Sequence, residues 1–185
     1  RYNSLQDKLQ LVSDLARTHK SNSGLPLTAS YHDSKDNNIL LCTKNKQYLF
    51  DIDTHELIQL ESPIKEEITY IAKSTNNQYF LASSHKIYCA KLNHGRLETI
   101  KHPELDNFHK VNYIYYHPET QMLVIGTLLD GIYLYNIHSR QLIDVHNGLQ
   151  DINVNSIIAS KENENEVLLA TNGAGVYKLN LGTYE

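Results

Sequence analysis

The side chains that could carry chemistry in this sequence are scattered rather than grouped in a catalytic pattern. The ten histidines include His102 and His109, which lie seven residues apart in one connecting segment, and two solvated loop histidines are the favoured interpretation. No G-x-S-x-G, P-loop or G-x-G-x-x-G motif occurs. Residues 33–38 lack the spaced ligands and final Glu of a calcium loop, so a turn is predicted there. The sequence therefore predicts no cofactor and no metal site.

Carboxylates and glycines likewise give no specific catalytic signal. A glycosidase needs two carboxylates that face one cleft, and although Asp106, Asp130 and Asp151 could supply them, nothing in their spacing requires it. The glycine-rich residues 172–175 lie between two expected strands and precede no helix, so they indicate a turn rather than a phosphate cradle. The chain itself is not expected to be an enzyme.

Composition narrows the function further. The formal net charge of -4 argues against a surface that follows nucleic-acid phosphates. No apolar run approaches the roughly 18 residues that span a bilayer, and no signal peptide opens the chain, so we expect a portion of a longer protein. Cys42 and Cys89 each lie in an apolar run without a C-x-x-C motif, which favours two buried free thiols over a disulfide.

The dominant feature of the sequence is a motif that occurs four times. Each copy has an apolar run that ends in a hydroxyl residue, followed by a strand-like segment with a tyrosine. The hydroxyl residues are Thr43, Ser83, Thr127 and Thr171, which are 40, 44 and 44 residues apart. The tyrosines are Tyr48, Tyr88, Tyr133 and Tyr177, which are 40, 45 and 44 residues apart. A period of about 40–45 residues with several short strands per unit is typical of a β-propeller.

Each unit is expected to contain four strands. The first strands are predicted at residues 27–31, 68–72, 111–115 and 154–158. The second is the apolar run, whose apolar residues on both faces suit a strand between neighbouring blades. The third carries the tyrosine, and Gly131 and Gly175 before it are expected to adopt turn or bulge conformations that other residues resist. Small residues precede the hydroxyls, as expected at a crowded position near the axis: Cys42, Ala82, Gly126 and Ala170.

The predicted fold is therefore all-β, a β-propeller of about four four-stranded antiparallel blades. We expect blades at 27–60, 68–100 and 111–145, an incomplete blade at 154–185, and the end of a preceding blade plus a connection at 1–26. The first eleven residues align with residues 50–60, which favours a strand there over the helix that their leucine spacing also allows. Residues 9–11 could complete the last blade and close a four-bladed ring, but part of a larger, seven-bladed type of propeller is favoured.

The last unit resembles the two-component regulator propeller repeat. Gly148-Leu149 is followed by an apolar strand, and residues 168–178 read Leu-Leu-Ala-Thr-Asn-Gly-Ala-Gly-Val-Tyr-Lys, similar to the family's L-W-I-G-T…G-G-L-Y-R pattern. The first unit keeps Gly24-Leu25-Pro26, and the third keeps Gly126-Thr127 and Gly131. The second unit lacks the glycines. In all four units another residue replaces the family tryptophan, namely Leu40, Phe80, Val124 and Leu168.

This resemblance implies a function that the residues alone do not. Proteins with this repeat are commonly hybrid two-component sensor histidine kinases of Bacteroidetes-type bacteria, and many respond to oligosaccharides. The resemblance implies a periplasmic, ligand-sensing part of an inner-membrane receptor. Its partners would be a small-molecule ligand such as an oligosaccharide, the remaining blades of the parent chain, and a second copy in a dimer. No kinase segment lies in the chain.

Ligand-binding residues are expected where the blades differ, because a feature that every blade shares is usually what makes a blade. The repeated tyrosines are therefore assigned to packing. The units differ most in the connections that enter each first strand, which share one face of a propeller with the turns between second and third strands. The predicted binding residues are His19, Lys20, Asn22, Lys44, Asn45, His85, His102, Asp106, Asn107, His109, Asp130, His146 and Asn172.

Two other functions remain open. A non-enzymatic protein-interaction scaffold would bind a partner protein and would have no small-molecule site. A propeller-type polysaccharide lyase or glycosidase would need the carboxylate pair discussed above and would act on polysaccharides.

Overall fold

Four small antiparallel sheets, one for each repeat, make up the computed structural model, which describes residues 26–108, 110–145 and 152–185. Blade 1 contains β1 (Leu27–Asp33), β2 (Asn38–Thr43), β3 (Gln47–Asp51) and β4 (Leu57–Gln59). Blade 2 contains β5 (Tyr70–Lys73), β6 (Gln78–Ala82), β7 (Ile87–Asn93) and β8 (Arg96–Ile100). Blade 3 contains β9 (Val111–His117), β10 (Met122–Thr127), β11 (Ile132–Asn136) and β12 (Gln141–Val145). Blade 4 has three described strands, β13 (Val154–Ala159), β14 (Glu166–Thr171) and β15 (Val176–Asn180).

The blades follow the propeller pattern that the repeat predicts. Within each sheet every strand pairs with the next strand along the chain. The only helical element among the described residues is the short 3-10 helix η1 (Pro103–Leu105), between blades 2 and 3. No helix in this part of the chain is long and apolar enough to cross a membrane. Residues 1–11, for which a strand was predicted, lie outside the described residues.

The repeated hydroxyl closes the turn between the second and third strands of every blade. In blades 1 and 2, Thr43 and Ser83 donate from Oγ to the carbonyl oxygen three residues later, at 3.2 and 3.1 Å. In blades 3 and 4, Thr127 and Thr171 donate to the carbonyl oxygen four residues later, that of a glycine, at 2.9 and 2.8 Å. Both glycines, Gly131 and Gly175, have positive φ, as predicted. The extra residue explains why the tyrosine follows the hydroxyl by five residues in two blades and by six in the others.

The hydrophobic core lies between the blades. Three clusters of buried side chains fill the three junctions between consecutive blades. Cys42 and Cys89 are buried free thiols in two of these clusters, as predicted. The repeated tyrosines Tyr88, Tyr133 and Tyr177 pack at the cluster edges, in agreement with their assignment to packing.

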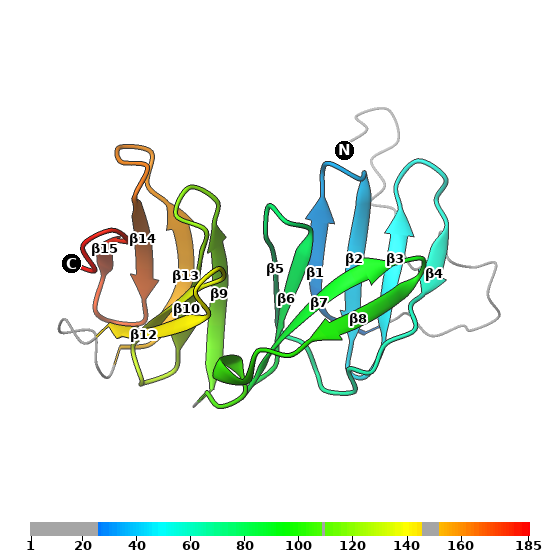
Figure 1. Ribbon diagram of the computed structural model, residues 1–185, viewed down its shortest axis with the longest axis horizontal. Coiled ribbons are helices and arrows are strands. Elements are labelled where there is room, and N and C mark those ends of the chain that lie inside the picture. The colour runs from blue at the N-terminus through cyan, green and yellow to red at the C-terminus, as the bar shows by residue number, and fades with distance from the viewer. Residues whose placement is uncertain (1–25, 109, 146–151) are drawn as a thin grey trace.

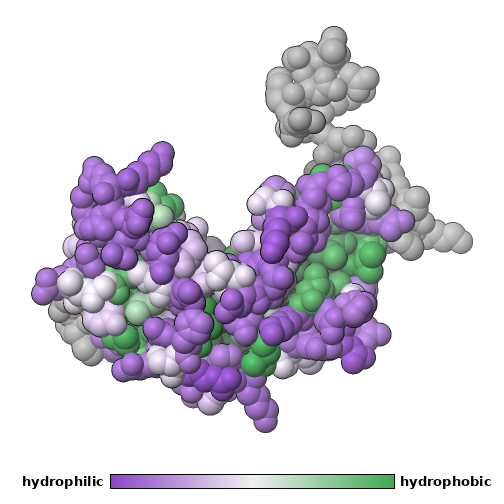
Figure 2. All heavy atoms as spheres, turned by 45° about the horizontal axis from the view of Figure 1, so that its top comes forward, coloured by the Kyte–Doolittle hydropathy of each residue, from purple (hydrophilic) through white to green (hydrophobic). Residues whose placement is uncertain are grey.

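Close approach between blades explains the small residue before the hydroxyl of blade 3. A Cβ atom on Gly126 of β10 would lie 2.8 Å from Cβ of Val154 on β13, the inner strand of the next blade. The inner strands β1, β5, β9 and β13 contact one another in chain order. Figure 1 shows the sheets side by side, with blade 4 at one end and blade 1 at the other. In the space-filling view the visible face is largely hydrophilic and is hollowed between these two ends (Figure 2).

Candidate functional site

The structure brings together only part of the predicted binding set. His19, Lys20, Asn22, His109 and His146 lie outside the described residues. Lys44 and Asn45 are exposed in the β2–β3 turn, and Asp130 and Asn172 lie in the equivalent turns of blades 3 and 4. The remaining four, His85, His102, Asp106 and Asn107, all lie at the junction of the β6–β7 turn with the segment that enters blade 3.

A pocket of about 450 Å³ lies beside this junction, and we call it the loop-face pocket. Its walls come from one end of β7 and β8 and from the connecting segment around η1. It is lined by Lys86, Ile87, Tyr88, Cys89, Thr99, Ile100, Lys101, His102, Pro103 and Asp106. Of the predicted residues, His102 and Asp106 line the pocket, whereas His85 and Asn107 lie next to residues that line it.

Apolar residues hold the connecting segment against the blades. Leu105 of η1 and Phe108 are buried in the cluster between blades 2 and 3. The Phe108 ring packs edge-on against the repeated Tyr133 of blade 3, with the ring centres 5.6 Å apart. The Phe108 amide donates to the His85 carbonyl oxygen at 2.8 Å, which ties the segment to the β6–β7 turn. The segment is therefore a packed part of the blade junction and positions its polar side chains.

His102 is buried rather than solvated, so the prediction of a solvated loop histidine was wrong for this residue. Only 6% of it is exposed, and its Nδ1 lies 2.5 Å from the hydroxyl oxygen of the fully buried Tyr135 on β11. Burial, assisted by the charge of Arg140, lowers the pKa of His102, so the imidazole is neutral at pH 7. Burial also raises the pKa of Tyr135 to about 12 and keeps its hydroxyl protonated. The packing of Leu105 and Phe108 pulls the segment, and His102 with it, out of solvent.

Charged groups lie at the rim of the loop-face pocket. Lys86 Nζ is 2.7 Å from Asp106 Oδ1 and 5.0 Å from the centre of the Tyr88 ring. The Tyr88 hydroxyl donates to Glu66 Oε1 at 2.6 Å. Hydrogen bonds from Ser83 and Tyr88 lower the pKa of Glu66. The site thus offers hydrogen-bond donors, acceptors and both signs of charge next to an apolar wall, a combination that suits ligand binding.

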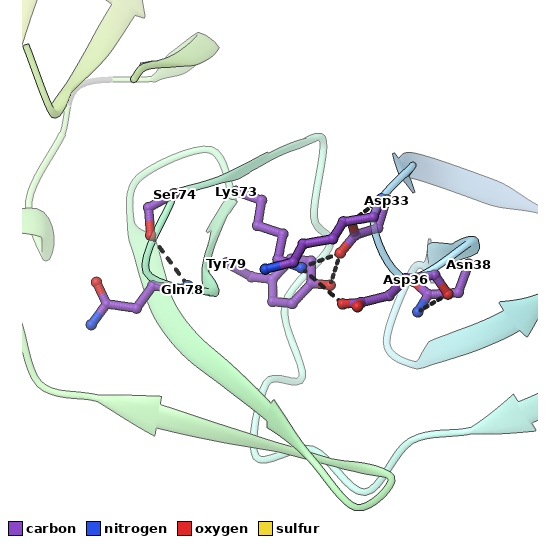
Figure 3. Close-up of polar contacts among 8 residues, drawn as sticks. Asp33, Asp36, Asn38, Lys73, Ser74, Gln78 and Tyr79 are labelled. Atoms are coloured by element: carbon purple, nitrogen blue, oxygen red, sulfur yellow. Dashed lines mark hydrogen bonds and ion pairs between the residues drawn. The ribbon is translucent and has the colours of Figure 1, made fainter. Parts of the chain in front are cut away.

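A second polar cluster joins blades 1 and 2, and sequence reasoning missed it. Lys73 at the end of β5 donates to the Asp33 carboxylate at the end of β1, and Tyr79 of β6 donates to the same carboxylate at 3.1 Å (Figure 3). Asp36 lies 3.4 Å from the Lys73 ammonium. The side chains of Lys73 and Asp33 are only 8% and 6% exposed. The turn at residues 33–38 is confirmed, but one of its residues forms a buried ion pair.

Mutual stabilisation keeps these groups charged. Burial alone would raise the pKa of Asp33, but the hydrogen bond and charge of Lys73 hold it below its usual value. The Lys73 pKa is raised by the same pairing, although burial opposes the shift. Burial raises the pKa of Tyr79 to about 12. None of the three groups changes its protonation near pH 7, so the cluster is suited to joining the blades rather than to moving protons. A pocket of about 360 Å³ beside it reaches blade 3 through Tyr115 and Tyr116.

Solved structures share this architecture at low sequence identity. The chain matches the computationally designed Ika4 protein with a TM-score of 0.64 and 16% identity, over 89% of this chain and 94% of that one. It also matches two structures of the extracellular domain of BT4673 from B. thetaiotaomicron. One is described as part of a hybrid two component system and the other as part of a one component system. Their TM-scores are 0.61 and 0.67, and their identities 16% and 14%.

The match to BT4673 covers 86% and 90% of this chain but only 22% of that protein's chain. No protein-family model and no curated protein sequence matches the chain. At these identities the likeness shows the fold, a β-propeller, and its structural neighbours include the extracellular domain of a two-component system.

Proposed function

We propose that the chain is a ligand-sensing propeller portion of the periplasmic domain of a two-component sensor histidine kinase, and that its ligand is an oligosaccharide bound in the loop-face pocket. The observation that carries the proposal is this pocket, because it contains predicted binding residues from the segment that differs most between blades. Its volume of about 450 Å³ lies within the roughly 300–1,000 Å³ of small-molecule sites. The shared architecture with the extracellular domain of a two-component system supports the sensor context.

The position of the pocket suggests how binding could be transmitted. The segment that forms one wall is fixed to blade 2 through His85 and to blade 3 through Tyr133 and Tyr135. A ligand that favours one position of this segment therefore favours one arrangement of the two blades. Such differential binding is what a ligand needs to shift a conformational equilibrium. In a dimeric receptor this shift would bias the kinase across the membrane.

Exposure of blade 4 supports a larger propeller. Val176 of β15 occupies the repeat position of Ile87 and Ile132, which are buried against the next blade. The Val176 side chain is nevertheless 69% exposed, and Ile158 on the same face is also largely exposed. A face that is buried between blades elsewhere in the chain is expected to pack against a further blade here. The four blades would then belong to a larger propeller of the seven-bladed type, completed by remaining blades of the parent chain.

The proposal is tested by measuring thermal unfolding of the 185-residue chain with a panel of oligosaccharides. A ligand that binds only the folded state raises the melting temperature, and the rise increases with the ratio of free ligand concentration to Kd. We expect one selective, dose-dependent stabiliser, whose effect is reduced in Lys86→Ala and unchanged in Lys161→Ala. Lys161 is a matched control because it is exposed in the β13–β14 turn of blade 4, away from the pocket. Absence of any glycan effect, together with saturable binding of a protein partner, would support the scaffold function instead.

A further inference from the structure

Two buried side-chain atoms of the connecting segment have no hydrogen-bond partner among the described residues, Nε2 of His102 and Oε2 of Glu104. His102 Nδ1 contacts the Tyr135 hydroxyl, whereas Nε2 makes no hydrogen bond with any described residue. The residue is 94% buried and lines the loop-face pocket. Buried polar nitrogens are rarely left without a partner, so an unpaired one beside a pocket points to a missing group.

The hydrogen bond between Tyr135 and Nδ1 of His102 decides whether Nε2 carries the ring proton. The Tyr135 hydroxyl is fully buried, and His102 Nδ1 is the partner that the structure gives it. Because a buried hydroxyl proton needs an acceptor, we assign Tyr135 as the donor and Nδ1 as the acceptor. In a neutral imidazole the ring proton then lies on Nε2. A residue that lines the pocket therefore has a buried N–H donor that requires an acceptor.

The charges around the pocket favour an anionic acceptor. Lys86 and Lys101 both line it, and Asp106 is the only acidic residue that does. The Asp106 charge is already compensated by Lys86 at 2.7 Å. Lys101 is exposed and makes no ion pair with another described residue. Among the residues that line the pocket, Lys101 is therefore the cation left for a ligand; the acidic Glu66, which accepts from Tyr88, and Glu104, which acts on His102, are not lining residues.

We propose that the loop-face pocket binds an oxyanion, a carboxylate or sulfate, that accepts a hydrogen bond from His102 Nε2 and pairs with Lys101. This inference deepens the proposed function and rests on it for the rest of the ligand, because it assigns an acidic rather than a neutral oligosaccharide to the pocket. Charge-assisted hydrogen bonds are the strong ones, and an N–H donor in a buried position loses little to competing water. Glu104, whose charge acts on His102 from the same segment, is the competing acceptor within the chain.

The test compares binding of matched ligands to the 185-residue chain by calorimetry. The ligands are a disaccharide with one uronic acid, its sulfated counterpart, the neutral disaccharide of the same linkage, and acetate and sulfate alone. We expect an acidic disaccharide to bind at least about 10-fold more tightly than the neutral one, since a hydrogen bond to a charged group contributes roughly 1.5–3 kcal/mol. Whether the carboxylate or the sulfate ligand binds more tightly identifies the source of the oxyanion.

Two substitutions of His102 separate the donor from the packing. In His102→Asn the side-chain oxygen can still accept from Tyr135 but the Nε2 donor is lost, and the acidic preference should fall about 10-fold or more. In His102→Gln an amide N–H takes the place of Nε2, and much of the preference should remain. Lys101→Gln should weaken acidic ligands a few-fold more than Lys161→Gln does. Glu104→Gln should strengthen them, because it removes the negative charge that competes with the ligand for His102.

The outcomes separate this inference from the proposed function. Equal or tighter binding of the neutral disaccharide would overturn the oxyanion site and leave oligosaccharide sensing intact. Binding of acetate or sulfate that depends on His102, without any glycan binding, would support the oxyanion site and overturn the oligosaccharide. Binding of every acidic ligand to His102→Asn with unchanged affinity would overturn the assigned role of Nε2.

Discussion

Replacing Asp33 with asparagine while Lys73 stays in place should destabilise the fold by about 3–5 kcal/mol, the usual cost of breaking a buried ion pair by removing one partner. This large destabilisation follows from burial, since the side chains of Asp33 and Lys73 are only 6% and 8% exposed. The Asp33 carboxylate also accepts from Tyr79 and from the Lys35 amide. An amide in place of the Asp33 carboxylate leaves the buried Lys73 ammonium with only Asp36, 3.4 Å away and 50% exposed, as a counter-charge.

Removing both charges should cost far less than removing one. In the double variant Asp33→Asn with Lys73→Met no buried charge is left unpaired, since Asp36, which loses its contact with Lys73, is 50% exposed. We expect a free energy of unfolding within about 1–2 kcal/mol of the parent protein. The assay is urea unfolding followed by circular dichroism and by tyrosine fluorescence, because coincident transitions are needed before free energies are compared. The double-mutant cycle then gives the coupling between the two residues.

A surface ion pair in blade 4 supplies the matched comparison. Lys178 and Glu162 are 2.9 Å apart, with side chains 59% and 79% exposed. Glu162→Gln should therefore change stability by less than about 1 kcal/mol. If Asp33→Asn costs no more than Glu162→Gln, the Asp33–Lys73 pair is screened by solvent and the argument from burial is wrong.

The pH dependence of the same variants gives a second measurement. The Asp33 pKa is lower in the folded protein than in the unfolded chain, so the unfolded chain binds more protons as the pH falls. The stability from this carboxylate is fully present above the unfolded pKa, near 3.9, and is lost as the pH falls through the folded value. The difference between the parent protein and Asp33→Asn should therefore shrink below about pH 4.

Three further predictions concern the blade junctions and turns. Gly126→Ala should destabilise the protein by about 1–3 kcal/mol, because its Cβ would lie 2.8 Å from Cβ of Val154, and urea unfolding checks this cost. Thr127→Val should cost more than Thr171→Val, since Thr127 is fully buried and its hydroxyl makes two hydrogen bonds, whereas the hydroxyl bond of Thr171 is exposed; thermal unfolding ranks the two. The lowered pKa of His102 means that stability should fall as the pH drops below about 6.5, and this part of the dependence should be absent in His102→Asn.

The fold could be predicted from sequence because each blade repeats the same short pattern of strand and turn residues. The hydroxyl that closes the turn, the dense apolar strand before it and the tyrosine after it recur at one period, so four copies reinforce a pattern that one would leave uncertain. The change in turn length between blades 2 and 3 was also visible in the sequence. A turn with one extra residue needs a positive φ before the third strand, and glycine occurs there only in the two longer turns, at Gly131 and Gly175.

The burial of His102 could not be predicted from its own neighbourhood alone. Polar connections between strands normally run over the surface, and Lys101, Glu104 and Asp106 suggested such a connection. Burial of the connection was indicated instead by Leu105 and Phe108, two large apolar residues that a solvated loop would not need. Their burial brings His102 within reach of Tyr135, a residue 33 positions away in the next blade.

The ion pair of Asp33 and Lys73 was missed because each residue was considered within its own blade. Side-chain contacts between blades join residues about one repeat apart: Lys73 and Asp33 are separated by 40 positions, Tyr116 and Thr75 by 41, and Asn112 and Asn153 by 41. The three contacts differ in chemistry, an ion pair, a hydroxyl pair and an amide pair, although they serve the same purpose of joining adjacent inner strands. In a repeat fold, complementary polar residues at one-period spacing are therefore the pattern that predicts contacts between blades, even where the residue types themselves do not repeat.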